Sequence, residues 1–285
     1  MDLKTLVDQP GKLPTIPKVV QKLIESFNAE DISAGEISRQ IASDPTLSAK
    51  LLRLANSAYF HVSRTVGTVD EALRMLGFVM VRNLVLSSGM VGAFRNTPGI
   101  DLPKFWRHTL YTACAARWLA ARLDVNGDLV FTLGMMHGIG QLQMHVCIPP
   151  AVLARLDARA HALETNRVDV EREVLGFHYG QVSAELARIW NFPPALITAL
   201  CDIPQPLAAA EFSVPAALVH LGAWRARGAV LDWPNAVAAA TYPAAVAERL
   251  RLAPDWTSAL APDGDAQEWM PPLAELTQGL DSLLE

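Results

Sequence analysis

The sequence predicts an all-α protein in which the helices form two lobes, and three observations carry that prediction. Apolar residues recur at helical spacing, helix punctuation is dense, and sustained alternation of β-branched residues is absent. The chain has 285 residues, of which 51% are hydrophobic, so it can bury a substantial core. We therefore expect few strands and two closely packed helical lobes.

The first lobe is expected over residues 1–97. It opens with an amphipathic helix whose apolar stripe comprises Val19, Val20, Leu23, Ile24 and Phe27. Three further helix starts are indicated, two by capping-box spacing and one by an Asp-Pro pair: Ser33 with Glu36, Thr68 with Glu71, and Asp44-Pro45. The run from Phe78 to Phe94 is almost entirely apolar, so we expect a helix that is buried on most sides.

The boundary between the lobes is expected at Arg95 to Gly99, which strings turn-forming residues together after a long apolar helix. The second lobe then covers residues 98–227. Its predicted helices are Pro103–Leu123, Leu129–Met136, Pro150–Ala160, Val168–Leu175, Gln181–Trp190, Pro194–Leu200 and Val214–Arg225. Residues 228–285 are rich in alanine and interrupted by proline, which predicts a C-terminal extension of short helices packed on the second lobe.

Charge and hydropathy exclude several classes of function. The chain has 24 Lys and Arg against 29 Asp and Glu, a net charge of −5, and no basic stripe, so we expect no nucleic-acid partner. Charged residues interrupt every apolar run before it reaches spanning length, so no membrane span is expected. The first residues lack the pattern of a signal peptide, which favours a cytoplasmic location. The cysteines are odd in number and far apart, which predicts reduced thiols at Cys114, Cys147 and Cys201.

Two of the seven histidines, His108 and His137, stand out as candidate metal ligands. His108 lies in a helix with small residues on the same face, and His137 follows an apolar stretch. Histidines from neighbouring helices can share a metal ion. The alternative, which we favour, is a pair of hydrogen-bonded interior histidines, and the residues alone leave both interpretations open.

Several motifs resemble the HDOD family, whose name means HD-related output domain. They are Leu13-Pro14, Asp44-Pro45, Leu51 to Phe60, Arg82-Asn83-Leu84, Phe105 to His108, Leu133 to Gly140 and Leu175-Gly176-Phe177. The likeness covers roughly Leu13 to Leu221, and the Leu-Ala-Asn-Ser-Ala-Tyr segment is its most specific part. It implies an all-α fold related to HD-type metal phosphohydrolases and used in bacterial signalling as a regulatory output or scaffold domain.

The resemblance also implies that catalytic ligands have been lost. Catalytic HD domains hold metal ions with an early His, a His-Asp doublet and a late Asp. His108 matches the early His and His137 the first half of the doublet, but Gly138 occupies the place of the Asp, and the late Asp corresponds to Ala223. Two imidazoles without a carboxylate suit Mg²⁺ or Mn²⁺ poorly. We therefore expect no catalytic residues, no stoichiometric metal and no cofactor.

The remaining members of the vestigial pocket are His178, Tyr179 and Asp202, together with His108 and His137. HDOD relatives commonly carry a histidine where Tyr179 stands, and His178 is displaced by one position, a rotation of about 100° along a helix. We interpret His178 and Tyr179 as a helix cap or packing pair. Asp202 is interpreted as part of a solvated helix end.

Four polar residues form an interaction or structural signature within the resemblance. Asn56 and Ser57 are expected to tie a helix end to the following turn. Arg82 and Asn83 could form a polar surface or a network between the lobes, but an ordinary solvated helix face is the interpretation we favour.

The leading expectation is a regulatory protein that is not an enzyme and acts in trans through signalling protein partners of unknown identity. The resemblance links such proteins to cyclic dinucleotides, motility or virulence. Two alternatives remain open. One is a divergent metal-dependent phosphohydrolase using His108, His137, His178 and Asp202. The other is a small-ligand sensor that binds a nucleotide in the vestigial pocket.

Overall fold

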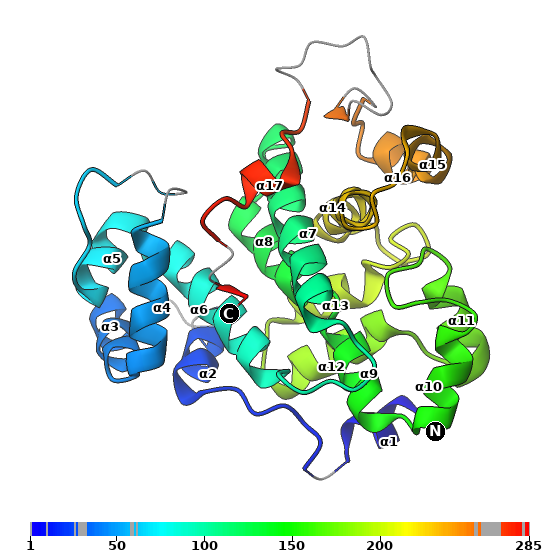
Figure 1. Cartoon of the computed structure of the whole chain (residues 1–285), viewed down its shortest axis with the longest axis horizontal. Coiled ribbons are helices and arrows are strands. Elements are labelled where there is room, and N and C mark those ends of the chain that lie inside the picture. Colours follow the sequence, from blue (N-terminus) through cyan, green and yellow to red (C-terminus); the bar gives the residue numbers. More distant parts are fainter. Residues whose placement is uncertain are drawn as a thin grey trace.

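The computed structural model shows a chain that is helical throughout the part it describes. That part comprises residues 2–9, 11–25, 27, 33–57, 60, 62–253, 256–257, 269–280 and 283–284. No strand occurs among these residues, and the helices gather into two lobes (Figure 1). The predicted all-α, two-lobed fold is therefore confirmed.

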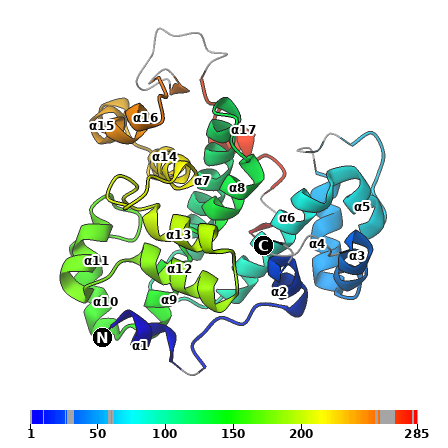
Figure 2. The same cartoon turned by 180° about the vertical axis from the view of Figure 1, so that it is seen from behind.

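The first lobe is formed by α2 to α6. Their bounds are α2 Lys18–Glu25, α3 Ala34–Ala42, α4 Pro45–Ala55, α5 Val69–Leu76 and α6 Phe78–Ala93. Helix α6 contacts α2, α4 and α5 on one side and α8 of the second lobe on the other. It is consequently the joint between the lobes, as Figures 1 and 2 show from opposite sides.

The second lobe contains α7 to α14. Their bounds are α7 Leu102–Arg122, α8 Gly127–Met136, α9 Ile139–Cys147, α10 Pro150–Asp157, α11 Arg167–Leu175, α12 Tyr179–Ile189, α13 Pro194–Asp202 and α14 Val214–Val230. Helices α7, α8 and α14 pack mutually at its centre, and α12 packs between α9 and α13. One large apolar core runs through both lobes, so they fold onto shared buried surface.

The two ends of the chain return to the second lobe. Helix α1, Leu3–Val7, packs against α9 and α12, although residues 1–97 were grouped with the first lobe. After α14 come three short helices, α15 Asn235–Thr241, α16 Ala244–Arg249 and α17 Leu273–Leu276. Helix α17 packs on α7 and α16 on α14, which is the kind of packing expected for the C-terminal extension.

Side-chain caps explain two of the three helix starts that the sequence indicates in the first lobe. Asp44 Oδ1 accepts from two backbone N–H groups of the first turn of α4, at 3.0 and 3.1 Å, and Thr68 Oγ1 accepts from a first-turn N–H of α5 at 3.1 Å. The expected capping box at Ser33 and Glu36 is wrong, because Ser33 makes no side-chain cap. The Glu36 carboxylate instead accepts from Lys22 Nζ at 3.0 Å.

Two helices differ from the sequence expectation in ways that matter for the site. Helix α9 is not predicted, because nearly all its side chains are buried and it lacks the polar face that marks a helix in sequence. Helix α14 continues past the expected end at Arg225 to Val230, so Arg227 lies on the helix.

The structure also bears on the cysteines and on membrane spans. Cys114, Cys147 and Cys201 are free thiols, as predicted. Among the described residues, no single helix is long and apolar enough to cross a membrane, and α5 with α6 meets that criterion only as a pair bent by 118°.

Glycines allow α7, α8 and α14 to approach closely. A Cβ on Gly134 of α8 would lie 2.5 Å from the Cα of Ala113, and one on Gly222 of α14 would lie 2.7 Å from the carbonyl oxygen of Thr112. Both clashing atoms belong to the backbone of α7, which cannot move aside as a flexible side chain could. The three helices therefore meet backbone to backbone around the face of α7 that carries His108.

Replacing Gly134 by alanine is expected to destabilise the fold by about 1–3 kcal/mol, because the added methyl group overpacks a rigid contact. Gly92 on α6 is a matched control, since nothing lies within 4 Å of its added Cβ. Gly92→Ala should leave stability unchanged or raise it by up to about 1 kcal/mol through helix propensity. Urea unfolding of both variants measures the difference, and equal midpoints would contradict the close-contact interpretation.

Candidate functional site

The structure brings His108 and His137 together in the middle of the second lobe. His108 lies on α7, and His137 is the C-cap residue of α8. Their ring centroids are 5.5 Å apart, and both side chains are buried. The two histidines singled out in the sequence are therefore neighbours.

Backbone carbonyls engage both rings. His108 Nε2 lies 3.3 Å from the oxygen of Ala223, and His137 Nδ1 lies 2.6 Å from that of Gly134. Since a carbonyl can only accept, these two nitrogens carry the hydrogens. Burial lowers the pKa of His137 to about 4 and holds the pKa of His108 well below its usual value, so both imidazoles are neutral at pH 7.

The residues present do not fit a hydrolytic metal centre. A Cβ added at Gly138, where the resemblance expects the Asp of the doublet, would lie 2.8 Å from Cζ of Phe105. The ring of Phe105 thus fills the space that a carboxylate would need. Among the described residues, no three His, Cys, Asp or Glu side chains gather to hold a metal ion. A hydrolytic zinc site normally has three protein ligands besides its water.

The other members of the vestigial pocket have separate roles. His178 is the N-cap of α12, where its Nδ1 accepts from the Gly180 N–H at 3.2 Å, while Gln181 Oε1 accepts from the His178 N–H at 3.0 Å. Tyr179 is buried, and that burial raises the pKa of its phenol to about 12. Asp202 ends α13, and burial raises the pKa of its carboxyl. Neither His178 nor Asp202 joins the histidine pair as a metal-holding group.

Asn56 links the end of α4 to the segment that leads into α5. Its Nδ2 donates to the carbonyls of Leu52 and Val66 at 2.7 and 2.9 Å, and its Oδ1 accepts from the Val66 N–H at 2.7 Å. The Ser57 hydroxyl is buried without a hydrogen-bond partner among the described residues. Of the two residues expected to tie this turn, Asn56 makes the link.

Arg82 and Asn83 lie at the junction between the lobes. The Arg82 guanidinium stacks 3.7 Å from the ring centroid of Phe27, whose ring packs in turn on Phe192 of the second lobe at 5.8 Å. Asn83 donates to a backbone carbonyl of α8 at 3.2 Å and accepts from the Thr132 hydroxyl at 3.0 Å. Arg82 and Asn83 therefore belong to a network between the lobes and not to an ordinary solvated helix face.

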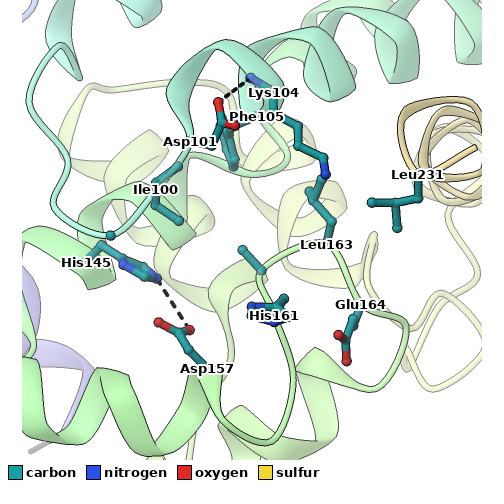
Figure 3. Close-up of a pocket in the computed structure, with 12 residues that line it drawn as sticks. Ile100, Asp101, Lys104, Phe105, His145, Asp157, His161, Leu163, Glu164 and Leu231 are labelled. Atoms are coloured by element: carbon teal, nitrogen blue, oxygen red, sulfur yellow. Dashed lines mark hydrogen bonds and ion pairs between the residues drawn. The ribbon is translucent and has the colours of Figure 1, made fainter.

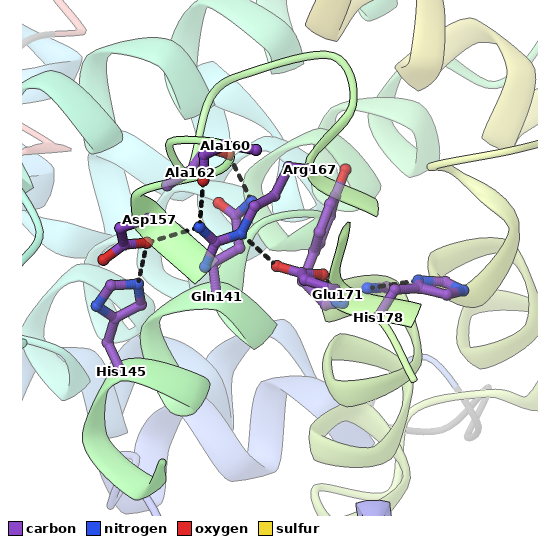
Figure 4. Close-up of polar contacts among 10 residues, drawn as sticks. Gln141, His145, Asp157, Ala160, Ala162, Arg167, Glu171 and His178 are labelled. Atoms are coloured by element: carbon purple, nitrogen blue, oxygen red, sulfur yellow. Dashed lines mark hydrogen bonds and ion pairs between the residues drawn. The ribbon is translucent and has the colours of Figure 1, made fainter. Parts of the chain in front are cut away.

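A buried ionic network near the start of α12 escaped the sequence analysis (Figure 4). Arg167 Nε donates to Glu171 at 2.7 Å, and one terminal nitrogen donates to Asp157 and to the Ala160 carbonyl, both at 2.6 Å. Glu171 also accepts from the Tyr179 N–H at 2.7 Å. The network therefore fixes the loop after α10 and the first residue of α12.

The spacing of these residues in the sequence gives no indication that they form a buried network. Arg167 and Glu171 are four residues apart, which in a sequence indicates an exposed pair on a helix surface. Both are instead fully buried, at 1% and 0% exposure. Burial raises the pKa of Glu171, while the charge of Arg167 and the hydrogen bonds from Arg167 and the Tyr179 N–H oppose that rise.

A cavity of about 360 Å³ opens between the start of α7 and the loop that follows α10 (Figure 3). Several of the polar groups that line it are engaged within the fold. Asp101 caps α7 by accepting from the Lys104 N–H at 3.0 Å, and Asp157 is held by Arg167 and lies 4.0 Å from His145 Nε2. The side chains of Lys104, His161 and Glu164 also line the cavity.

Buried neutral histidines make stability depend on pH. The pKa values of His137, His178 and His220 are each lowered to about 4, chiefly by burial. In the unfolded chain these rings bind protons below about pH 6.5, so acidification from there towards pH 4 favours unfolding. Each ring removes up to about 3 kcal/mol once the pH has fallen through that window.

Urea midpoints should accordingly be constant above about pH 7 and fall as the pH drops through 6.5. His178→Asn is the informative variant, because asparagine is a good N-cap and cannot bind the proton. It should fold at neutral pH and lose stability less steeply on acidification. Identical pH profiles for this variant and the native chain would contradict the assignment.

Comparison with known proteins shows which sequences and structures this chain resembles. An uncharacterized protein from Treponema pallidum (strain Nichols) is 23% identical over 207 residues, which are 69% of this chain and 38% of that protein, so the chain spans less than half of that relative. A crystal structure from Shewanella amazonensis SB2B, provisionally named a phosphohydrolase, is 31% identical with a TM-score of 0.76, covering 99% of this chain and 98% of that one.

A second crystal structure, from Marinobacter aquaeolei VT8 and provisionally named a signal transduction protein, shares the fold. It is 22% identical with a TM-score of 0.68, and the likeness covers 100% of this chain and 60% of that one. The family model of the HDOD domain matches residues 13–206. Because that match spans more than half of the sequence, the chain belongs to the HDOD family.

Proposed function

We propose that this chain is a non-catalytic regulatory protein of a bacterial signalling circuit and acts by binding partner proteins. The observation that carries the proposal is the replacement of the metal-binding carboxylate by Gly138 and the filling of its space by Phe105. A link to cyclic dinucleotides is part of the proposal and follows from the HDOD resemblance.

The donor chemistry around the histidine pair supports a role without hydrolysis. A metal-assisted hydrolase needs a water held by the metal, with ligands on the remaining positions. Here one nitrogen of each ring already donates to a carbonyl, and the hard ions Mg²⁺ and Mn²⁺ prefer oxygen ligands that these residues do not supply.

The groove between the lobes supports binding to a protein. A depression of about 510 Å³ lies between the first lobe and α7, lined by Phe60, Val62, Ser63, Met75, Leu76, Met80 and Arg117. Met75 is 44% exposed, and flexible methionine side chains adapt to partner surfaces. A partner that contacts both lobes would bind one lobe arrangement more tightly than another and so shift the population.

A metal-dependent phosphohydrolase is the second candidate, favoured by the name of the Shewanella neighbour. Incubation of the purified chain with Mn²⁺ and a panel of nucleotides and cyclic dinucleotides distinguishes the two. We expect no turnover above the blank and no difference between the native chain and the His108→Ala, His137→Ala double variant. Turnover that the folded double variant lacks would establish an enzyme and overturn the proposal.

Protein binding is tested by placing a photo-crosslinking amino acid at Met75 in the cell that encodes the chain. Leu207, which is 49% exposed, is the matched control outside the groove. A discrete adduct is expected at Met75 and not at Leu207.

The captured protein should also bind the purified chain. Met75→Glu should weaken that binding at least tenfold and Leu207→Glu should not, since a charge placed in an apolar contact must be desolvated. Equal adducts at both positions, or equal affinity of both variants, would contradict the proposed surface.

A further inference from the structure

A second cavity, of about 220 Å³, adjoins the histidine pair and is separate from the one in Figure 3. It lies between the first turn of α12, the loop before α11, the end of α13 and one face of α14. The side chains that matter for its chemistry are Tyr179, His220 and Arg227. Ala223, whose carbonyl accepts from His108, also lines it, so the cavity reaches the edge of the vestigial pocket.

Arg227 brings an uncompensated charge to this cavity. Its Nε is buried without a hydrogen-bond partner, and its guanidinium makes no ion pair among the described residues. Glu164 lines the rim, but its side chain is exposed and forms no salt bridge with Arg227. The Arg227 side chain is only partly exposed, its guanidinium remains charged, and its buried Nε is unpaired, so this site favours an anion.

The positive charge of Arg227 acts on the surrounding rings. After burial, its charge is a further cause that lowers the pKa values of His108, His137 and His220. It also opposes the rise in the pKa of Tyr179. The charge of Arg227 thus influences the protonation of the titratable residues around the vestigial pocket.

Two further side chains can complete an anion site. The Tyr179 hydroxyl stays protonated, because burial raises its pKa to about 12, and it can donate. His220 Nδ1 donates to the Ile203 carbonyl at 2.9 Å, which fixes the ring of His220 beside the cavity. Trp224 Nε1 is already used by Thr241 Oγ1 at 3.1 Å, so the donors left for a ligand are those of Arg227, of Tyr179 and of the exposed Thr165 hydroxyl.

The shape and chemistry of the site define the class of ligand. A guanidinium presents a planar fork that pairs with two oxygens of a phosphate or carboxylate. The volume lies below the roughly 300–1,000 Å³ of pockets for drug-sized ligands, which suits a single charged group with little attached to it. A phosphate group supplies more acceptor oxygens than a carboxylate for the donors of Arg227 and Tyr179.

We propose that this cavity binds a phosphate group, free or as a small monoester, through Arg227 and Tyr179, with His220 forming its wall. The guanidinium supplies the positive charge that a metal ion would supply in a hydrolase. The ligand would bridge α12 and α14 without being cleaved. This inference does not depend on the protein-binding role and can fail or succeed independently of it.

The experiment measures binding of inorganic phosphate to the purified chain by calorimetry and by thermal unfolding. Sodium chloride and sodium acetate at matched ionic strength are the comparison anions. Phosphate at tenfold its Kd should raise Tm by about 2–4 °C in a saturable way, and chloride and acetate should not. Methyl phosphate in a parallel arm identifies the source, since tighter binding than phosphate indicates a small monoester and equal or weaker binding indicates the free ion.

Arg227→Met removes the charge, and replacing a partly enclosed, unpaired charge by an apolar side chain of similar size is tolerated, so this variant should fold. It should lose the phosphate effect. Arg227→Lys keeps the charge without the fork and should bind at least tenfold more weakly. Arg225→Met, on the same helix but lining a different cavity, is the matched control and should bind like the native chain.

Three outcomes would overturn the assignment. They are a phosphate shift no larger than that of chloride, a larger shift with acetate, and a shift that survives in folded Arg227→Met. If Arg227→Met does not fold, Arg227→Lys and Tyr179→Phe decide, because both retain most of the packing. Unchanged affinity in both of these variants would likewise reject the site.

Discussion

The close contact of α7 with α8 and α14 is the constraint on which the rest of the structure depends. Gly134 and Gly222 leave no room for a side chain at the crossings, so the backbones touch. That approach brings His108 to the carbonyl of Ala223 and beside His137. A wider separation of α7 and α14 would leave the His108 ring without its acceptor in an apolar interior, whereas His137 would keep the Gly134 carbonyl of its own helix.

The same contact sets the electrostatic character of the second lobe. Burial keeps the imidazoles neutral, whereas a guanidinium keeps its proton at any ordinary pH. A hydrolytic HD centre gathers carboxylates around a cation that binds from solution. In this chain the cation is the covalently attached Arg227, and any mobile ion that neutralises it must be negative.

Local chemistry explains which parts of the fold could be predicted. Asp44 and Thr68 act through hydrogen bonds within one turn, so their short motifs specify the helix starts. The whole of α9 could not be found in this way, since a helix buried on every side has no amphipathic period. The boundary between the lobes near residue 97 and the start of the C-terminal extension at residue 228 stay predictions from the sequence.

Only those residues of the candidate site that lie within the family motifs could be predicted from the sequence. His108 and His137 stand in such motifs, and the structure places them side by side. Arg167 and Arg227 carry no local signal, because their importance comes from burial and from residues distant in sequence. Spacing along a helix cannot tell an exposed arginine from one enclosed by other helices.

The packing of α1 has a consequence for the order in which the protein can assemble. Leu6 and Val7 are buried in a small core with Met144 and Ile148, which follow them by more than a hundred residues of chain. During synthesis this segment emerges before α9 and α12 and stays without its binding surface until they have formed. Because closing so long a loop slows folding, we expect α1 to dock on the second lobe only after α9 and α12 have formed.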